Sequence, residues 1–384
     1  MRETVVAEVR AEAIRQNLAA IRRRVGGHRP ICVPVKANAY GHGLGQILPI
    51  LAAAGVPQVA VANLDEALAV RSLGWNRPIL CFGLLPSEAD ERTCRQAAGE
   101  AVAADVACTI ASREHVGHLA AAARRLHRHA HIEIKIDTGM GRMGLMPEQA
   151  EQLIGEAARL PGVTIDGVYT HFASADDPDP AFTRQQLGRF VGCVERWRAG
   201  GLSIGAAHAA NSAAVFRLPE SHLDKVRPGL AVYGYCDWSA ENRPVDLTPA
   251  MRVVSCLAAV RQLPPGHTVG YGRTFTTGRP SLIGVVPIGY ADGYRRLLSN
   301  DAVMTLEPIR GQSRRHVPVI GRVSMDQTTV DLTDAGEVRT GDPVVVIDDD
   351  PAAANSVETL ARKLDTIPYE VTCLISQRVR RMTV

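Results

Sequence analysis

The stretch VPVKANAYGHG, residues 33–43, ends an apolar run with a lysine and continues into a small, glycine-containing turn. In an α/β barrel, the residue that closes a buried strand lies at the end where reactive groups are found. One interpretation of Lys36 is an ordinary lysine that reaches solvent from a strand end. The apolar residues before it favour a desolvated amine instead, which loses its proton readily and suits Schiff-base chemistry with an aldehyde.

The first part of the chain alternates short apolar runs with Ala- and Leu-rich helical patterns. This alternation is typical of repeated β-α units with parallel strands, and about eight units close a TIM-type barrel. The candidate strands are residues 31–36, 57–63, 77–82, 101–106, 131–137, 163–171, 205–211 and 224–230. We therefore predict an α/β fold with a (β/α)8 barrel over residues 1–240.

From residue 241 the helical periodicity fades, and strand-like segments separated by turn residues follow. One helix is predicted over residues 356–364, with Asn355 or Ser356 as its cap. These patterns predict a second, mostly β domain over residues 241–384.

The composition excludes several function classes. The 43 basic and 40 acidic residues are scattered and give a net charge of +3, so no strong field favours nucleic acid or a membrane. The eight cysteines lack metal-ligand spacing, which predicts no metal site and favours a reducing compartment. Because no apolar signal core or bilayer-spanning stretch is evident, we expect a cytoplasmic protein.

Polar residues that close the other predicted strands are the next candidates for a site. They are Asn63, Asp137 with nearby Arg142, His171, Asn211 with Ser212, and Arg227. The loops after the last two barrel strands commonly bind phosphate. Taken alone, Asn211 and Ser212 are simply a helix cap. Together with an imine-forming lysine, they point to a phosphorylated aldehyde, pyridoxal 5′-phosphate.

In HIEIKIDTGMGRMG, residues 131–144, isoleucines alternate with Glu133, Lys135 and Asp137, so one face of the strand is apolar and the other charged. A salt-bridge ladder inside the barrel is one interpretation of the charged face. The glycine-rich turn that follows would let Arg142 fold back toward the site.

Nine motifs together resemble the bacterial alanine racemases, and they occur in that family's order from near one end of the chain to near the other. They are VPVKANAYGHG, IDTGMGRMG, YTHFASAD, HAANSA, VRPGLAVYG, GYGRTF, PIGYADG, GRVSMDQTTVDLT and IPYEVTC. The resemblance implies a pyridoxal-phosphate-dependent isomerase that interconverts L- and D-alanine and supplies D-alanine for peptidoglycan. It also implies a homodimer with shared active sites.

The resemblance assigns cofactor contacts to particular residues. Lys36 would carry the cofactor as a Schiff base, His171 would stack on the pyridine ring, and Arg227 would contact the pyridine nitrogen. The residues that would hold the phosphate and its loop are Tyr40, Asn211, Ser212, Gly229, Leu230 and Tyr369. Because arginine keeps its proton, the ring nitrogen would stay unprotonated and the cofactor would be a weaker electron sink, which limits transamination.

Substrate contacts follow from the same resemblance. Arg142 and the backbone at Met325 would orient the carboxylate, and Tyr290, Met325 and Tyr369 would narrow the pocket to favour a methyl side chain. Tyr271 would be the second base and would reach the partner's lysine. Lys135 matches a position that is often carboxylated on its amine.

A racemase must remove the α-proton from one face and return a proton to the other, so two flanking bases are the direct solution. Lys36 would serve the D-alanine proton and Tyr271 the L-alanine proton. Since a phenol is a weak base at neutral pH, Tyr271 would need cationic or hydrogen-bonding neighbours.

Three alternatives differ in class. A non-catalytic pyridoxal-phosphate homeostasis protein keeps the barrel and its lysine but lacks a C-terminal domain. A barrel amino-acid decarboxylase shares the cofactor and the two-domain plan, but its cysteine and acidic substrate motifs are not evident here. A catalytically silent barrel with a structural lysine is the third.

Overall fold

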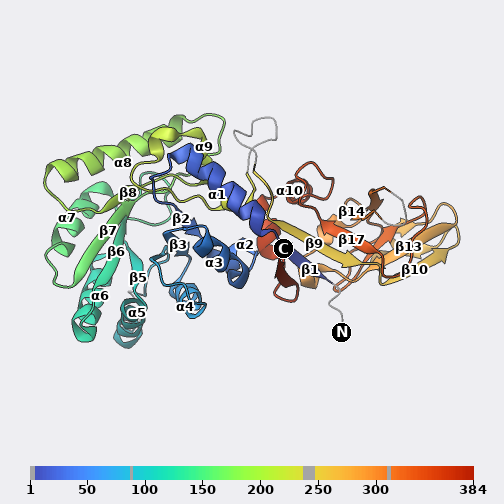
Figure 1. The fold of residues 1–384 in the computed structure, drawn as a ribbon, viewed down its shortest axis with the longest axis horizontal. Helices are drawn as coiled ribbons and strands as arrows, with labels where there is room; N and C mark the ends of the chain where they lie inside the picture. The colour runs from blue at the N-terminus through green and yellow to red at the C-terminus, as the bar shows by residue number, and fades with distance from the viewer. Residues whose placement is uncertain (1–4, 87–89, 237–246, 309–312) are drawn as a thin grey trace.

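The computed structural model describes residues 5–86, 90–236, 247–308 and 313–384. Figure 1 shows two units side by side along the long axis, one in which helices surround parallel strands and one built mainly of strands. This arrangement confirms the predicted α/β barrel followed by a mostly β unit.

The barrel sheet contains seven parallel strands that are neighbours in the order of the chain. They are β2 (Cys32–Pro34), β3 (Gln58–Val61), β4 (Ile79–Cys81), β5 (Val106–Ile110), β6 (Ala130–Lys135), β7 (Val163–Tyr169) and β8 (Ala206–His208). The eighth position is shorter than the predicted strand 224–230. There a single parallel bridge joins Val226 to Ile31, and the Cys32 N–H donates to the Val226 carbonyl at 2.9 Å.

Eight helices cover the outside of this sheet (Figure 1). They are α1 (Ala11–Val25), α3 (Leu44–Ala53), α4 (Leu64–Ser72), α5 (Glu91–Ala103), α6 (Arg113–Leu126), α7 (Pro147–Ala157), α8 (Ala181–Ala199) and α9 (Ser212–Arg217). Ile132 and Ile134 on β6, and Ile136 just after it, pack in the main hydrophobic core, as the alternation predicted. The opposite face of β6 is therefore left for the barrel lumen.

One predicted strand is wrong. Residues 101–106 were expected to be extended, but α5 continues to Ala103, with Ala101 and Val102 on its buried face. The strand begins only at Val106, after Asp105 has turned the chain with a φ of +54°. A short Ala/Val run has no periodicity of its own, so its sequence fits a buried helix face and a buried strand equally well.

The second unit is built on a six-stranded sheet with the order β15-β14-β17-β9-β1-β18. Its strands are β1 (Val6–Val9), β9 (Met251–Cys256), β14 (Val303–Leu306), β15 (Arg315–Pro318), β17 (Pro343–Ile347) and β18 (Arg380–Thr383). A three-stranded sheet of β10 (Ala259–Leu263), β13 (Ser281–Val286) and β16 (Thr328–Asp331) accompanies it, with a hairpin of β11 (Thr268–Val269) and β12 (Phe275–Thr276).

Two helices follow near the end of the chain, α10 (Val357–Lys363) and α11 (Pro368–Leu374). Ser356 is the cap of α10, because its side chain accepts a hydrogen bond from the Thr359 N–H. This confirms the predicted helix and chooses between its two candidate caps.

The first strand of the chain belongs to the second sheet. β1 runs antiparallel to β9 and parallel to β18, so it lies between two strands from the other end of the sequence. These residues fall in the range predicted for the barrel, 1–240, and the predicted boundary at residue 240 lies outside the described residues. None of the eight cysteines forms a disulfide. In the described part of the chain, no helix is both long and apolar enough to cross a lipid bilayer.

Candidate active site

A cavity of about 610 Å³ lies at the carboxyl ends of the barrel strands. It brings together ten of the residues singled out in the sequence, which are Lys36, Tyr40, Lys135, Arg142, His171, Asn211, Ser212, Arg227, Gly229 and Tyr369. Tyr369 comes from α11, so the second unit contributes to the wall of a barrel cavity.

Lys36 begins a left-handed turn, α2 (Lys36–Tyr40). The φ angles of Ala37, Asn38, Ala39 and Tyr40 lie between +51° and +56°, a region that costs free energy for any residue with a Cβ. Gly41 continues with a φ of +82°, and a Cβ there would lie 2.0 Å from the carbonyl oxygen of Thr372 in α11. The turn after Lys36 is therefore pressed against the helix that carries Tyr369.

The cavity lowers the pKa of three basic groups. Burial, followed by the charge of Arg142, lowers the pKa of Lys36. The same two causes lower the pKa of Lys135 to about 8, and its Nζ lies 5.8 Å from the centre of the Tyr169 ring. Burial also lowers the pKa of His171 to about 3, helped by Arg227. A site that destabilises bound protons in this way favours bases over acids.

One end of the cavity offers hydroxyl and backbone groups. The Ala231 N–H donates to the Ser212 Oγ at 3.2 Å, and a Cβ on Gly229 would lie only 2.6 Å from the Tyr40 hydroxyl. The Tyr40 ring lies 5.6 Å from the ring of Tyr369. Leu230 follows Gly229, is buried, and does not line the cavity with its side chain. A small oxyanion fits such a cradle because hydroxyl donors converge where no side chain intrudes.

Arg227 is fixed by a hydrogen-bonded chain that the sequence analysis did not find. Its Nη1 donates to the Nδ1 of His208 at 2.6 Å, and the Nε2 of His208 lies 2.7 Å from the Oε2 of Glu133. Since Nδ1 accepts, His208 is neutral with its proton on Nε2. Burial lowers the pKa of His208 to about 3, in agreement with a neutral ring.

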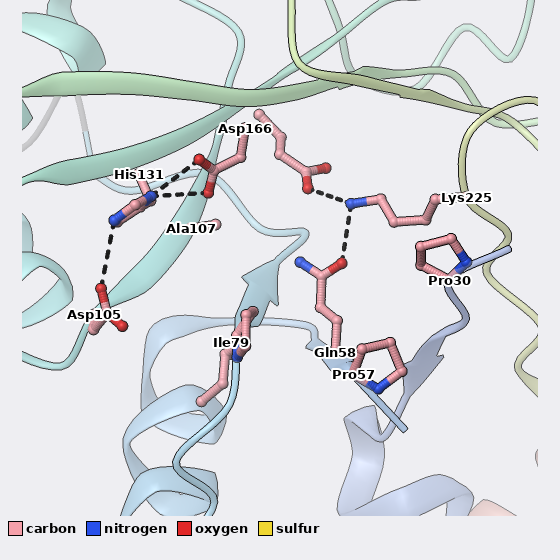
Figure 2. A pocket seen from close by; sticks show the side chains of 11 residues that line it. Pro30, Pro57, Gln58, Ile79, Asp105, Ala107, His131, Asp166 and Lys225 are labelled. Carbon is pink, nitrogen blue, oxygen red and sulfur yellow. Dashed lines mark hydrogen bonds and ion pairs between the residues drawn. The ribbon is translucent and has the colours of Figure 1, made fainter. Parts of the chain in front are cut away.

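The same series of hydrogen bonds continues from Glu133 to the amino end of the barrel. The other oxygen of Glu133 accepts from the Nζ of Lys225 at 2.7 Å, and the same Nζ donates to Gln58 at 3.0 Å. Figure 2 shows Lys225 and Gln58 at a second cavity, of about 450 Å³, which also contains the pair His131 and Asp166. Of the charged residues predicted on this face, Glu133 forms an ion pair, with Lys225, whereas Asp137 accepts from backbone N–H groups; the described contacts thus give one ion pair where one interpretation expected a salt-bridge ladder.

Tyr169 is a further wall residue that sequence reasoning missed. Its ring stacks on His208 with 5.1 Å between centres, and its hydroxyl lies 2.7 Å from the Thr109 hydroxyl. Tyr169 and His208 are the last residues of β7 and β8, but the predicted strands continue to residues 171 and 211, so the strand-end rule selects the residues that follow them. The motifs YTH and HAANSA contain both, so the alternation of side chains along these strands was the available signal.

Two of the strand-end residues, Asn63 and Asp137, are not among the residues that line the cavity. The Asn63 side chain accepts from the Glu66 N–H and caps α4. The Asp137 carboxylate accepts from three backbone N–H groups of the glycine-rich turn. Asn211 lines the cavity and also caps α9, because its side chain accepts from the Ala214 N–H.

Tyr271, Tyr290 and Met325 lie in the second unit and are not among the residues that line the cavity of this chain. Tyr271 is 72% exposed and Met325 is 52% exposed. Tyr290 and Met325 are neighbours, because the Ala291 N–H donates to the Met325 carbonyl at 3.0 Å. All three side chains are therefore available to another molecule.

Comparison with known proteins identifies the family. Residues 9–237 match the family model of the alanine racemase N-terminal domain, and residues 250–383 match that of the C-terminal domain. "Alanine racemase 2" of Caldanaerobacter subterraneus subsp. tengcongensis is 40% identical over 98% of this chain and 93% of the relative. The alanine racemase of Desulfovibrio desulfuricans is 39% identical over 99% of this chain and 98% of the relative.

A solved structure supports the same conclusion. The alanine racemase of Clostridium difficile 630 in complex with cycloserine superposes with a TM-score of 0.88 and 30% identity, covering 100% of this chain and 96% of that chain. Both units and their order therefore match those of a complete relative.

Proposed function

We propose that this chain, which belongs to the alanine racemase family of isomerases, interconverts L- and D-alanine with pyridoxal 5′-phosphate in the cavity at Lys36. The observation that carries the proposal is the desolvated amine of Lys36 in one cavity with Arg142 and the Gly229 cradle. The match of residues 250–383 to the family's C-terminal domain argues against a homeostasis protein that has only a barrel.

The residues present fit the cofactor. Tyr40, Ser212, the backbone at Gly229 and Leu230, and Tyr369 would hold the phosphate, with Asn211 fixing the loop. His171 would face the ring and Arg227 would contact its nitrogen. When bound, pyridoxal 5′-phosphate joins an amine through its aldehyde and withdraws electrons from the α-carbon, which acidifies the α-proton.

The chain's own groups would then bind the substrate and move its proton. Arg142 and the Met325 backbone would hold the carboxylate, and the Lys36 Nζ would accept or return the α-proton on the D-alanine face. The lowered pKa of Lys36, caused by burial and Arg142, supports its role as a base. Tyr290, Met325 and Tyr369 would restrict the side chain to a methyl group.

Tyr271 would act on the L-alanine face of the site in a partner subunit. Its 72% exposure and its position outside the cavity of its own chain support a homodimer with shared sites. We propose accordingly that the barrel unit, residues 1–240, binds the cofactor, and that the β unit, residues 241–384, supplies the second base. D-alanine made in the cytoplasm would serve peptidoglycan synthesis.

Lys135 is the proposed site of carboxylation. Burial and Arg142 lower its pKa to about 8, so a fraction of the amine is neutral at pH 7 and can attack dissolved CO2. The new N–C bond gives a carbamate, and the nitrogen releases a proton. The anion would relieve the repulsion among Lys36, Arg142 and Arg227. A ¹³C NMR carbamate signal from ¹³CO2, absent in Lys135→Ala, would test this, and a spectrum without such a signal would refute it.

The test of the proposed reaction is α-hydrogen exchange in deuterated water with each alanine enantiomer. The wild type should exchange the α-hydrogen of both L-alanine and D-alanine for deuterium. Tyr271→Phe should lose exchange from L-alanine by about 100-fold or more while keeping exchange from D-alanine, and Lys36→Ala should show the opposite preference. Absence of exchange in the wild type loaded with pyridoxal 5′-phosphate would refute the proposed function.

A further inference from the structure

The left-handed turn after Lys36 needs something to hold it. Ala37, Asn38, Ala39 and Tyr40 all have positive φ angles, and each of them carries a Cβ that makes this conformation unfavourable. Such strain persists only where surrounding contacts over-determine the backbone. One of these contacts fixes the far side of the turn, where the Leu44 N–H donates to the Asn38 Oδ1 at 2.8 Å.

The near side of the turn is fixed by Glu66, a residue in the first turn of α4. One carboxylate oxygen of Glu66 accepts from the Ala37 N–H at 2.7 Å, and the other accepts from the Ala62 N–H at 2.7 Å. Ala37 directly follows Lys36, while Ala62 follows β3 and lines the cavity. One carboxylate therefore ties the backbone beside Lys36 to the end of the neighbouring barrel strand.

The position of Glu66 is itself fixed by the start of its helix. The Glu66 N–H donates to the Asn63 Oδ1 at 2.9 Å, and the Ala67 N–H donates to the Asn63 carbonyl. Hydrogen bonds from backbone N–H groups to a carboxylate are shorter and stronger than those between neutral groups. The cap at Asn63, the carboxylate of Glu66 and the turn at Lys36 thus form one connected unit.

We propose that Glu66 is a positioning residue for Lys36, and that it acts by holding the backbone turn from which the amine projects into the cavity. This proposal rests on the proposed function, in which Lys36 moves the α-proton. Glu66 would act through the backbone of Ala37 without touching the substrate. Its charge also opposes the effect of burial and Arg142 on the pKa of Lys36, so the same carboxylate has a second, electrostatic influence on the amine.

The first test does not depend on activity. Glu66→Gln keeps the size of the side chain but leaves one oxygen for two N–H groups, and Glu66→Ala removes both acceptors. Asp65→Asn, on the adjacent exposed residue of the same helix turn, is the matched control for the charge. Backbone hydrogen exchange, measured by mass spectrometry with and without pyridoxal 5′-phosphate, should quicken at least tenfold over residues 36–43 and 62 in Glu66→Ala. The effect should be smaller in Glu66→Gln and absent in Asp65→Asn.

The second test asks whether the turn controls one face of the reaction. If Glu66→Gln slows proton transfer by Lys36, the α-deuterium isotope effect should rise with D-alanine and fall with L-alanine. A loss of folded protein would lower both rates and leave both isotope effects unchanged. Unchanged isotope effects, or unchanged exchange over residues 36–43, would overturn the proposal. A wild type that does not racemise alanine would instead refute the proposed function, while the hydrogen-exchange arm still decides whether Glu66 holds the turn.

Discussion

The Nζ of Lys225 lies 2.7 Å from the Oε1 of Glu133, and both side chains are buried in the barrel lumen. Burial alone would raise the pKa of Glu133, but the charge of Lys225 and the hydrogen bonds from Lys225 and the neutral His208 outweigh burial and lower that pKa below its usual value. The carboxylate is thus ionised and depends on its partners.

Removing one partner of this ion pair should lower the free energy of unfolding. Lys225→Met would leave the buried carboxylate of Glu133 without its charged partner, and we expect a loss of about 3–5 kcal/mol in the free energy of unfolding. Lys225→Met combined with Glu133→Gln should recover most of this loss, because the glutamine oxygen can still accept from His208. Urea denaturation of the three proteins measures both effects. A single variant within about 1 kcal/mol of the wild type would contradict the ion-pair argument.

The Gly229 cradle predicts a specific loss of cofactor affinity. Gly229→Ala would place a Cβ 2.6 Å from the Tyr40 hydroxyl, so we expect the Kd for pyridoxal 5′-phosphate to rise at least tenfold, about 1.4 kcal/mol. Gly188→Ala is the matched control, because its Cβ in α8 would meet no atom within 4 Å. An absorbance titration gives both values, and equal affinity in the two variants would exclude this cradle as the phosphate site.

Shared active sites predict recovery of activity on mixing. Lys36→Ala and Tyr271→Phe proteins should each be nearly inactive as racemases. After the subunits are exchanged in equal amounts, half of the dimers are hybrids, and each hybrid has one site with both bases intact. We expect about a quarter of the wild-type activity, measured by polarimetry. No recovery, despite hybrids detected by native mass spectrometry, would show that both bases come from the same subunit.

Buried histidines predict a loss of stability in mild acid. Burial lowers the pKa of His42 to about 4, and lowers those of His171 and His208 to about 3. Between the unfolded value near 6.5 and these folded values, the unfolded chain binds more protons, so stability falls as the pH falls. Each histidine contributes about 1.4 kcal/mol per pH unit below about 6.5.

Urea denaturation at pH 7.5 and pH 5.5 should therefore show a loss of about 2–4 kcal/mol in the free energy of unfolding. His42→Asn keeps a side-chain N–H for the carbonyls of Ala39 and Tyr40 that the ring now contacts, and it removes one titrating group. Its loss between the two pH values should be smaller by about 1.4 kcal/mol, the contribution of one histidine. Greater stability at pH 5.5 than at pH 7.5 would refute this argument.

The sequence predicted the barrel well because the pattern of each β-α unit, an apolar run followed by helical periodicity, lies within a short stretch of sequence. Strands β3, β4 and β7 lie within their predicted ranges, since apolar runs and helical periodicity alternate around them. The extent of the eighth strand could not be predicted in the same way. It consists of a single bridge between Val226 and Ile31, and pairing between residues so far apart in sequence, which closes the barrel, leaves no local pattern. The place of β1 in the second sheet depends on pairing with residues about 245 and 374 positions away, which no window of sequence reveals.

In the candidate site too, residues marked by a local sequence pattern could be predicted, and residues that depend on a distant partner could not. The strand-end rule found Lys36, His171 and Arg227, which line one cavity. It could not find His208 or Glu133, whose importance comes from a partner on another strand. It also gave no hint that Glu66 reaches back to the Ala37 backbone, because a glutamate in the first turn of a helix is already favourable on its own.

The strand β1 is made first but pairs with β9 and β18, which are made much later. On the ribosome, the nascent barrel must therefore carry an unpaired apolar strand until β9, about two thirds of the way along the 384 residues, has been made, an arrangement open to wrong pairing between nascent chains. The second sheet closes only once β18 has been synthesised, because β1 pairs with it across about 374 residues of sequence.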